Sequence, residues 1–455
     1  MSKITTLAQI CDALSDGLHK APIFNPTGEY LFVNATNLEN GHIVDKGEGK
    51  RADFSEYQKY GIELNDRTIL YSIDGTIGNI ARYRGEKVIL GKGACYVMVK
   101  NGVDPDYIYF LLQSEAFNGY IRKMSTGSTI HHISLETMRS FKFSLPEYNT
   151  QKNISSVLMA VENKIHHNSR LAAELESMAK TIYDYWFTQF DFSDADGKPY
   201  RASGGAMEWN EQLKRNIPTG WKIGQLSDIA NITMGQSPAG ETYNESGNGK
   251  IFYQGCTDFG TRFPVPRVYT TAPTRYAKAG DILMSVRAPV GTLNVAIEDC
   301  SIGRGLAALN SKMGSQLYLW YTLAGFKQLF DALDRNGTTF GSITKDTLYE
   351  MKVIIPDPVL VKAFEEIVQP IEQKIRATEQ ENRELTKLRD WLLPMLMNGQ
   401  ATVADAEEEV SKVIPFAPQT VEVRQAARNF GNKKTDDTAD LVKAFMRRKK
   451  NDSKA

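Results

Sequence analysis

Two long stretches of the chain place apolar residues alternately three and four positions apart, a spacing that lines up one narrow face of a helix. The stretches are residues 149–190 and 358–400. The residues on this face are Leu158, Val161, Ile165, Asn168 and Leu175 in the first stretch, and Val368, Ile371, Ile375, Thr378 and Leu385 in the second. A period of about 3.5 residues sustained over about four heptads is typical of a coiled coil. We therefore predict two long helices that pair with each other, and packing against a domain face is the alternative.

The second half of the chain repeats the first at a distance of about 210 positions. Val161–Ile165 matches Ile371–Ile375 at an offset of 210 (371 − 161), and Ile69–Ser72 matches Ile282–Ser285 at an offset of 213 (282 − 69). A repeat of this length indicates a duplicated domain with its helix, because the units of a solenoid are only about 20–50 residues long. The duplication implies approximate two-fold symmetry within one chain, so the two helices are expected to pair antiparallel. A protein with approximate two-fold symmetry is suited to recognising a partner that also has two-fold symmetry, such as duplex DNA.

Residues 1–148 and 218–357 are predicted to be mixed α/β domains, because short apolar runs in them alternate with Gly, Pro and Asn turns. Each domain also holds a helical pattern, at Tyr107–Lys123 in the first and at Gln316–Leu333 in the second. The expected fold class is α+β, with two such domains that are each followed by one of the long helices.

The remaining segments connect or extend these parts. Residues 191–217 are rich in turn-forming residues and are expected to link the two halves. A tail over residues 401–455 carries mixed charge and one short amphipathic patch, Ala439–Met446. We expect most of this tail to be flexible, because it has few apolar residues to bury.

Composition narrows the class of protein without indicating a function. The chain has 455 residues, a formal net charge of zero and four cysteines that stand far apart in the sequence. Zero net charge argues against a strongly basic, DNA-coating protein. Local basic loops can still supply the phosphate contacts of a neutral protein that recognises a specific DNA sequence. Isolated cysteines, together with the lack of an apolar run of about 18 residues, favour a cytoplasmic protein with reduced thiols and no membrane partner.

The sequence contains no motif for catalysis or for metal binding. A phosphate-binding loop needs Gly-Lys followed by Ser or Thr, but Arg51 and Ile251 stand at that place. The adjacent histidines at 131–132 and at 166–167 are expected to point apart, so they do not suit a shared metal ion. We predict no catalytic residue, no metal site and no cofactor bound by this chain.

Loops that repeat between the two halves carry the chemistry of DNA contacts. Hydroxyls, glycines and cations suit phosphates, and His, Asn or Arg can reach base edges. One cation between two glycines occurs at Lys92 and again at Arg304, and Arg287 replaces Asp74 in a turn that is otherwise retained. The predicted DNA-contact residues are Lys92, Thr126, Ser128, Thr129, His131 and His132 in the first half, and Arg287, Arg304, Asn336, Thr338, Thr339 and Ser342 in the second. For each loop the alternative is a polar turn without a ligand.

Several motifs follow one another in a recognisable order: Pro218–Ile229, Met234–Pro238, Gly280–Gly291, and Ile343–Pro356 leading into Ile371–Ile375. In this order they make the chain resemble a known family, the specificity (S) subunit of type I restriction-modification systems. The resemblance extends over about 400 residues of the chain, because the first half repeats the plan of the second.

The resemblance implies a subunit with no reaction of its own. Its two domains would be target recognition domains that each read one half of a bipartite asymmetric DNA site, with the paired helices as the spacer. Two modification subunits would dock on the chain and methylate adenine with S-adenosylmethionine, and restriction (motor-nuclease) subunits would join for cleavage that uses ATP and Mg²⁺. No self-oligomer is required. The alternatives are a component of a related fused restriction class and a coiled-coil scaffold whose two domains do not bind DNA.

Overall fold

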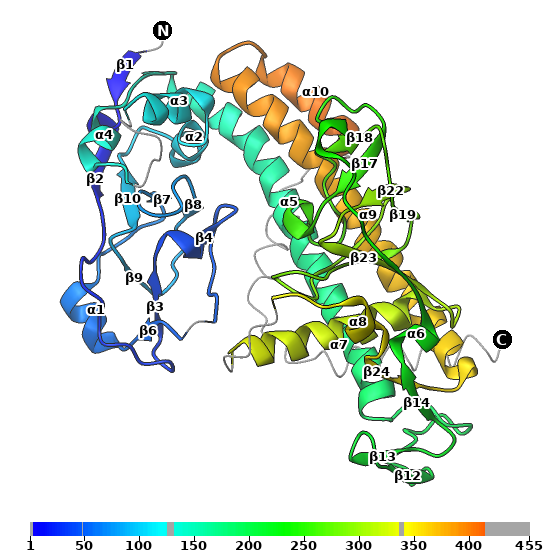
Figure 1. The fold of residues 1–455 in the computed structure, drawn as a ribbon. Helices are drawn as coiled ribbons and strands as arrows, with labels where there is room; N and C mark the ends of the chain where they lie inside the picture. Colours follow the sequence, from blue (N-terminus) through cyan, green and yellow to red (C-terminus); the bar gives the residue numbers. More distant parts are fainter. Residues whose placement is uncertain (1–2, 48, 125–131, 336–340, 415–455) are drawn as a thin grey trace, which may run out of the picture. The chain divides into compact units, whose positions relative to one another are not determined.

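The computed structural model describes residues 3–47, 49–124, 132–335 and 341–414 (Figure 1). The described residues form two compact units. Unit 1 holds those of Met1–His167 and of Asn382–Arg428, and unit 2 holds those of Asn168–Glu381. Each of the two long helices therefore contributes one part to unit 1 and another part to unit 2. None of the helices in the described part of the chain has the length and hydropathy needed to span a lipid bilayer.

The centre of unit 1 is a four-stranded antiparallel sheet in the order β2-β10-β7-β8. All residues of β7 are buried, as in a strand that is covered on both faces. The strands are β2 (Cys11–Ser15), β10 (Ala94–Val99), β7 (Thr68–Ser72) and β8 (Ile80–Arg82). Three smaller sheets pair β3 (Tyr30–Val33) with β6 (Arg51–Ala52) and β9 (Val88–Leu90), β1 (Lys3–Thr6) with β11 (Lys142–Leu145), and β4 (Leu38–Glu39) with β5 (His42–Ile43). Unit 1 also has the helices α1 (Phe54–Tyr60) and α4 (Leu135–Ser140).

Unit 2 repeats this plan in the same strand order. Its four-stranded antiparallel sheet is β15-β23-β20-β21, with β15 (Ala230–Met234), β23 (Leu306–Ser311), β20 (Ile282–Ser285) and β21 (Leu293–Val295). β17 (Lys250–Tyr253) runs parallel to β22 (Cys300–Ile302) as β3 does to β9, and β14 (Lys222–Gln225) pairs with β24 (Lys352–Ile355) as β1 does with β11. Further elements of this unit are β16 (Tyr243–Asn244), β18 (Tyr269–Thr270), β19 (Tyr276–Ala277), α6 (Leu226–Ile229), α7 (Gln316–Arg335) and α8 (Lys345–Tyr349). The duplication predicted from the sequence is thus present in the topology.

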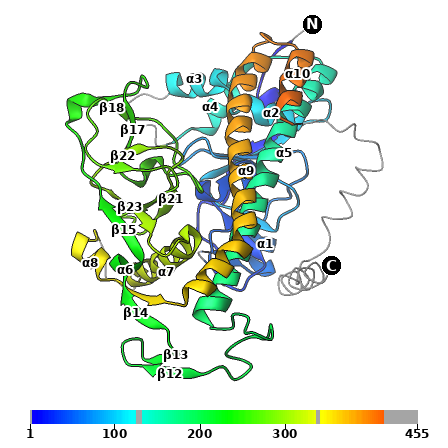
Figure 2. The ribbon, with the colours of Figure 1, turned by 90° about the vertical axis from the view of Figure 1, so that its right-hand side faces the viewer.

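Two long helices, α5 (Tyr148–Tyr183) and α9 (Pro358–Met397), occupy the stretches in which the sequence predicts them (Figure 2). Helix α9 begins with a proline, whose fixed φ and missing N–H suit the first helical position. Helix α5 continues into a π-helical turn, Asp184–Thr188, and the chain then leaves the helix at Phe190, which has a φ of 67°. The residues predicted to line one narrow face of each helix are called its stripe below. Every one of them is buried or half-buried.

In unit 1, the first part of α5 packs on the last part of α9. Leu158 and Val161 of α5 share one hydrophobic core with Leu385 of α9, and all three side chains are 0% exposed. The side-chain amide of Asn382 donates to the backbone carbonyl of Ile165 at 3.3 Å. A polar residue within this apolar contact therefore has a hydrogen-bond partner on the other helix, as buried polar groups require.

In unit 2, the last part of α5 packs on the first part of α9. Ala179 of α5 and Ile375 of α9 belong to the same hydrophobic core. Asn168, a polar member of the predicted stripe, is 1% exposed, and its amide donates to the Glu381 carboxylate at 2.7 Å. The stripe residues thus meet the other helix in both units, although each unit takes a different part of the two helices.

The helical pattern that the sequence predicts over Tyr107–Lys123 is present as two shorter helices. The structure has α2 (Pro105–Leu111) and α3 (Glu115–Met124). Ser114 separates them, because its hydroxyl donates to the carbonyl of the last residue of α2 at 2.7 Å and accepts the N–H of Phe117 at 3.4 Å. Serine side chains compete with helix hydrogen bonds in this way, and they favour a helix end over a helix interior.

Helix α10 (Val403–Val413) lies in the region that the sequence analysis assigns to a mostly flexible tail. Thr402 and Asp405 form a capping box, in which each side chain accepts the backbone N–H of the other residue, at 3.2 and 2.9 Å. Ala406 and Val410, one turn apart, are 0% exposed in the core of unit 1. The rest of the tail, with the patch Ala439–Met446, lies outside the described residues.

The segment that the sequence analysis predicts as a linker, residues 191–217, contributes to the core of unit 2. It includes most of a hairpin in which β12 (Met207–Asn210) pairs with β13 (Arg215–Pro218). Phe192 stacks on Trp221, with 5.4 Å between the ring centroids, and both side chains are buried. The segment is therefore a packed part of unit 2 as well as a connection.

Candidate nucleic-acid interface

The turn that follows β7 in unit 1 has the same hydrogen bonds as the turn that follows β20 in unit 2. Ser72 Oγ donates to the carbonyl four residues later at 2.6 Å and accepts the N–H seven residues later at 2.8 Å. Ser285 makes the same two bonds and accepts the N–H at 2.9 Å. A buried serine thus closes each turn. The turns present Asp74, half-buried, in unit 1 and Arg287, exposed, in unit 2.

A second segment of the chain meets each of these turns. An isolated β-bridge joins Asp74 to His132 in unit 1, and the equivalent bridge joins Arg287 to Ser342 in unit 2. In unit 1, the N–H of the residue after His132 donates to the carbonyl of the residue before Asp74 at 2.8 Å. In unit 2, the N–H of the residue after Ser342 donates to the carbonyl of the residue before Arg287, also at 2.8 Å. The structure therefore brings together the predicted contact residues Arg287 and Ser342, and it places the predicted residue His132 beside Asp74.

The two turns with a cation between glycines lie against the same strand ends. The carbonyl of the second glycine accepts the N–H of the residue before Asp74 at 3.1 Å in unit 1, and that of the residue before Arg287 at 2.9 Å in unit 2. Lys92 and Arg304, the cations of these turns, are both exposed. A Cβ atom on Gly91, Gly303 or Gly305 would lie within 3.0 Å of neighbouring protein atoms, so these glycines let each turn pack closely on its own domain while the cation stays exposed.

The same backbone framework thus carries different charges in the two units. The cluster has the half-buried Asp74 and the exposed Lys92 and His132 in unit 1, and it has the exposed Arg287, Arg304 and Ser342 in unit 2. Within the described part of the chain, neither Arg287 nor Arg304 has an ion-pair partner. Both guanidinium groups are therefore available to phosphates or to base edges.

Seven of the predicted contact residues lie outside the described residues. They are Thr126, Ser128, Thr129 and His131 in the first half, and Asn336, Thr338 and Thr339 in the second. In the sequence they precede His132 and Ser342, the residues that form the two bridges. Their role as contacts stays a prediction.

An ion cluster inside unit 2, which the sequence analysis does not predict, fixes the sheet region to both long helices. Arg262 is 3% exposed, forms an ion pair with Glu372 of α9, and lies 3.0 Å from Glu176 of α5. Its guanidinium lies 3.9 Å from the ring centroid of Trp320. Burial lowers the pKa of Arg262, but the two carboxylates outweigh burial and raise this pKa above its ordinary value. No local signal marks this cluster, because its members are far apart in the sequence.

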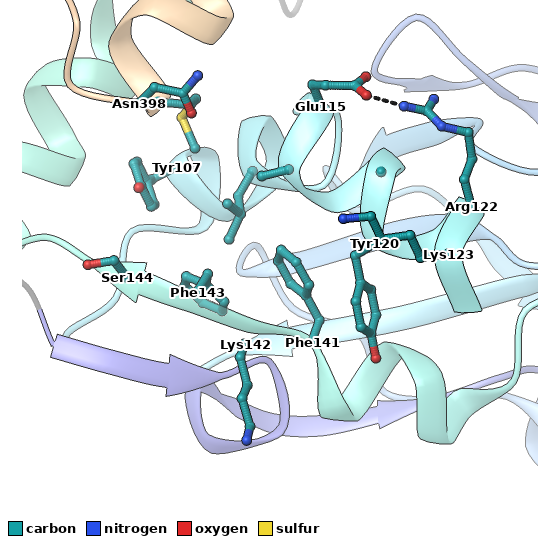
Figure 3. Close-up of a pocket in the computed structure, with 14 residues that line it drawn as sticks. Tyr107, Glu115, Tyr120, Arg122, Lys123, Phe141, Lys142, Phe143, Ser144 and Asn398 are labelled. Carbon is teal, nitrogen blue, oxygen red and sulfur yellow. Dashed lines mark hydrogen bonds and ion pairs between the residues drawn. The ribbon is translucent and has the colours of Figure 1, made fainter. Parts of the chain in front are cut away.

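A groove of about 800 Å³ lies in unit 1 between α3 and β11 (Figure 3). Tyr107, Phe141 and Phe143 line it together with the exposed amines of Lys123 and Lys142. None of the predicted DNA-contact residues lines this groove. We therefore keep it apart from the candidate interface.

The histidines of the described residues give no metal centre. No group of three or more His, Cys, Asp or Glu side chains in the described ranges is placed to hold a metal ion. The His166 ring stacks on the His42 ring, with 3.7 Å between the centroids. Burial lowers the pKa of His42 to about 4, so this ring is neutral at physiological pH.

A family model matches each half of this duplicated arrangement. The model of the type I restriction modification DNA specificity domain matches residues 2–177 and again residues 218–388. The chain belongs to this family. Each match includes one turn framework and part of one long helix, so the two parts are called the first and second specificity domains below.

Relatives of known name are specificity subunits as well. The chain is 30% identical over 419 residues to a protein described as the MjaX specificity subunit of a type I restriction enzyme from Methanocaldococcus jannaschii, with 88% of this chain and 94% of the relative covered. It is 25% identical over 355 residues to the MjaIX specificity subunit from the same organism, with 74% and 78% covered. It is 21% identical to the HindI specificity subunit from Haemophilus influenzae, with 83% and 95% covered.

A solved structure has the same fold. The crystal structure of the type I restriction-modification system S subunit from M. genitalium matches with a TM-score of 0.53 and 18% sequence identity, over 87% of this chain and 96% of that chain. At this level of identity, the likeness shows the fold alone. It agrees with the predicted fold class in its coarse form, two specificity domains of mixed helix and sheet content.

Proposed function

We propose that the chain is the DNA sequence-specificity subunit of a type I restriction-modification complex, and that each specificity domain reads one half of a bipartite asymmetric DNA site. The observation that carries this proposal is that the two domains share one backbone framework but have different side chains at its contact positions. Asp74 and His132 stand in the first domain where Arg287 and Ser342 stand in the second. Base edges are distinguished by the donors and acceptors that face them, so different side chains on the same backbone favour different bases.

The exposed cations divide into two roles. Lys92 and Arg304 contact phosphates from their glycine turns, which positions each domain on the duplex without reading its sequence. Arg287 reaches a base edge, where a guanidinium bonds guanine bidentately. His132 and Ser342, which lie beside the turns, take part in the same readout.

The long helices set the spacer between the two half-sites by pairing as an antiparallel coiled coil. The contacts between α5 and α9 within each unit support this, as does the burial of the polar stripe residues Asn168 and Thr378, which are 1% and 2% exposed. Polar residues in an apolar seam fix the register of a coiled coil. A helix of 40 residues is about 60 Å long, which exceeds the roughly 34–36 Å of one turn of DNA.

The chemistry of the complex belongs to its partners. Two modification subunits dock on this chain and methylate adenine with S-adenosylmethionine, and restriction subunits join for cleavage with ATP and Mg²⁺. The chain contributes sequence recognition and binds none of these cofactors itself. The family of the chain and the names of its relatives support this division of work.

Mixed with an excess of the modification subunit, the chain is expected to bind two copies of it. The physical reason is the duplication, which repeats each specificity domain together with its long helix. Native mass spectrometry of the saturated complex measures the stoichiometry. A single bound copy at saturation contradicts duplicated docking surfaces.

The proposed function is tested by sequencing the methylated bases in the genome of the host, with and without the gene for this chain. A bipartite adenine-methylated motif is expected to disappear when the gene is deleted and to return when it is restored. A methylation pattern that does not change would favour a scaffold that does not bind DNA.

A further inference from the structure

Gly41 in unit 1 and Arg262 in unit 2 occupy the same place in the duplicated framework. The Arg82 N–H donates to the Gly41 carbonyl at 3.1 Å, and the Val295 N–H donates to the Arg262 carbonyl at 2.9 Å. Arg82 and Val295 are themselves equivalent, because they differ by 213 positions (295 − 82), the same offset that relates the strands β7 and β20 with which they pair. Gly41 therefore supplies no side chain at the position from which Arg262 supplies a buried guanidinium in unit 2.

The carboxylate that Arg262 binds is also duplicated. Glu372 is the partner of Arg262 in unit 2, and Glu162 is its counterpart in unit 1, 210 positions earlier (372 − 162). Glu162 is 14% exposed, and one of its oxygens accepts the Tyr109 hydroxyl at 2.9 Å. Among the described residues, the guanidinium paired with it is that of Arg389, at 4.0 Å, which is beyond hydrogen-bond distance. Burial raises the pKa of Glu162 and outweighs the Tyr109 hydrogen bond and the charges of Arg389 and Arg84, which lower this pKa.

A pocket of about 670 Å³ lies where the missing side chain would be. Gly41, Tyr109 and Glu162 line it, together with the side-chain amides of Asn79 and Gln113. A Cβ atom on Gly41 would lie 3.7 Å from the Glu162 carboxylate and 2.6 Å from the Tyr109 hydroxyl. The Tyr109 hydroxyl is therefore nearest to this position, and the Glu162 carboxylate lies next to it. Gly41 has a φ of +78°, so its backbone also favours glycine.

The cations around this pocket are held by other acceptors. Arg84 donates to two backbone carbonyls, at 2.7 and 3.0 Å. Arg389 donates to Asp390 at 2.8 and 3.0 Å, and Lys46 pairs with Glu39. One oxygen of the buried carboxylate is thus left without a charged donor at bonding distance.

We propose that this pocket binds a guanidinium group, which takes the place that Arg262 fills in unit 2. A planar guanidinium matches a carboxylate with two parallel hydrogen bonds. The amide oxygens of Asn79 and Gln113 accept its remaining N–H donors. The group comes either from a small molecule or from an arginine of a partner protein. The site rests on the comparison of the two units, and only its filling by an arginine of the modification subunit rests on the proposed function.

Methylguanidinium and its neutral analogue methylurea are the probes that test this site on the full-length chain. Saturation-transfer NMR on their methyl protons reports binding without any change to the protein. Methylguanidinium is expected to bind with a dissociation constant on the order of 1 mM, and methylurea is expected not to bind. Equal signals for the two probes, or no saturable binding of methylguanidinium, overturn the proposal even if every variant fails to fold.

Two variants place the binding at Glu162. Glu162→Gln keeps the shape and still accepts the Tyr109 hydroxyl, and it is expected to weaken methylguanidinium binding about ten- to hundredfold. Glu115→Gln, a change at an exposed carboxylate of the same unit, is the matched control and leaves binding unchanged. Equal binding by the Glu162 and Glu115 variants overturns the proposal. Addition of the modification subunit then separates the two sources, because an arginine of that subunit displaces the probe, whereas a small-molecule site retains it.

Discussion

Replacing Arg262 by methionine is expected to lower the free energy of unfolding of unit 2 by about 3–5 kcal/mol. The change removes the buried counter-ion of Glu372, which is itself 3% exposed. Arg376 still bonds Glu372 at 2.9 Å, but its side chain is 41% exposed and its charge is screened by solvent. A carboxylate that loses its buried partner keeps the cost of desolvation and loses the attraction that offset it. Urea-induced unfolding followed by circular dichroism measures the change.

Two further variants separate the loss of charge pairing from the loss of packing. Arg262→Met combined with Glu372→Met removes both charges and is expected to recover most of the stability, because apolar residues of similar volume replace buried ion pairs well. Arg170→Met breaks an exposed ion pair with Glu174 and is expected to change stability by less than about 1 kcal/mol. If Arg262→Met also changed stability by less than about 1 kcal/mol, Arg262 would not anchor the second specificity domain.

Alanine substitutions at Arg304 and at Arg287 are expected to weaken DNA binding in two different ways. Arg304→Ala removes a phosphate contact, so it weakens binding to all sequences alike and lowers the slope of log affinity against log salt by about 0.9. Arg287→Ala removes a base contact, which costs about 1–3 kcal/mol at the cognate site and relaxes recognition at one position of the second half-site. Titration of the assembled methyltransferase complex with duplexes that differ by one base pair, at several salt concentrations, measures both effects.

The matched control for these arginines is Arg170→Ala, an exposed arginine on α5 that is outside the candidate interface. It is expected to change neither the salt slope nor the motif. A relaxed first half-site after Arg287→Ala would contradict the assignment of this residue to the second half. Unchanged affinity after both substitutions would show that the exposed cations lie on polar turns without a ligand, the alternative that the sequence leaves open.

The strands and long helices could be predicted because their signals are local. β7 contains the continuous apolar run Ile69–Tyr71, and the stripe of α9 recurs over many turns, so each pattern is visible without knowledge of the partners. The duplication adds a check, since a pattern seen at Ile69–Ser72 recurs at Ile282–Ser285. The glycines on both sides of Lys92 and Arg304 also recur between the two halves, and this recurrence indicated the two cations as candidate contacts.

What the sequence did not reveal depends on contacts between distant segments or on a few atoms. Arg262 is an ordinary loop residue until the chain brings it to Glu372, 110 positions away. At the break between α2 and α3, the single hydroxyl of Ser114 bonds both the end of one helix and the start of the next. Helix α10 did have a local signal, the Thr402-x-x-Asp405 capping box, but the charged composition of the whole tail concealed it.

The central claim is that each specificity domain reads its own half of the DNA site. Residues 218–357 are exchanged for the matching segment of a relative that keeps an arginine at the place of Arg262, so that the anchor to Glu372 and Glu176 is retained. The methylated motif is then determined by sequencing the host genome. The account predicts that one half of the motif changes to that of the relative, while the other half and the spacer stay as they are. A motif that changes in both halves, or in neither, would contradict it.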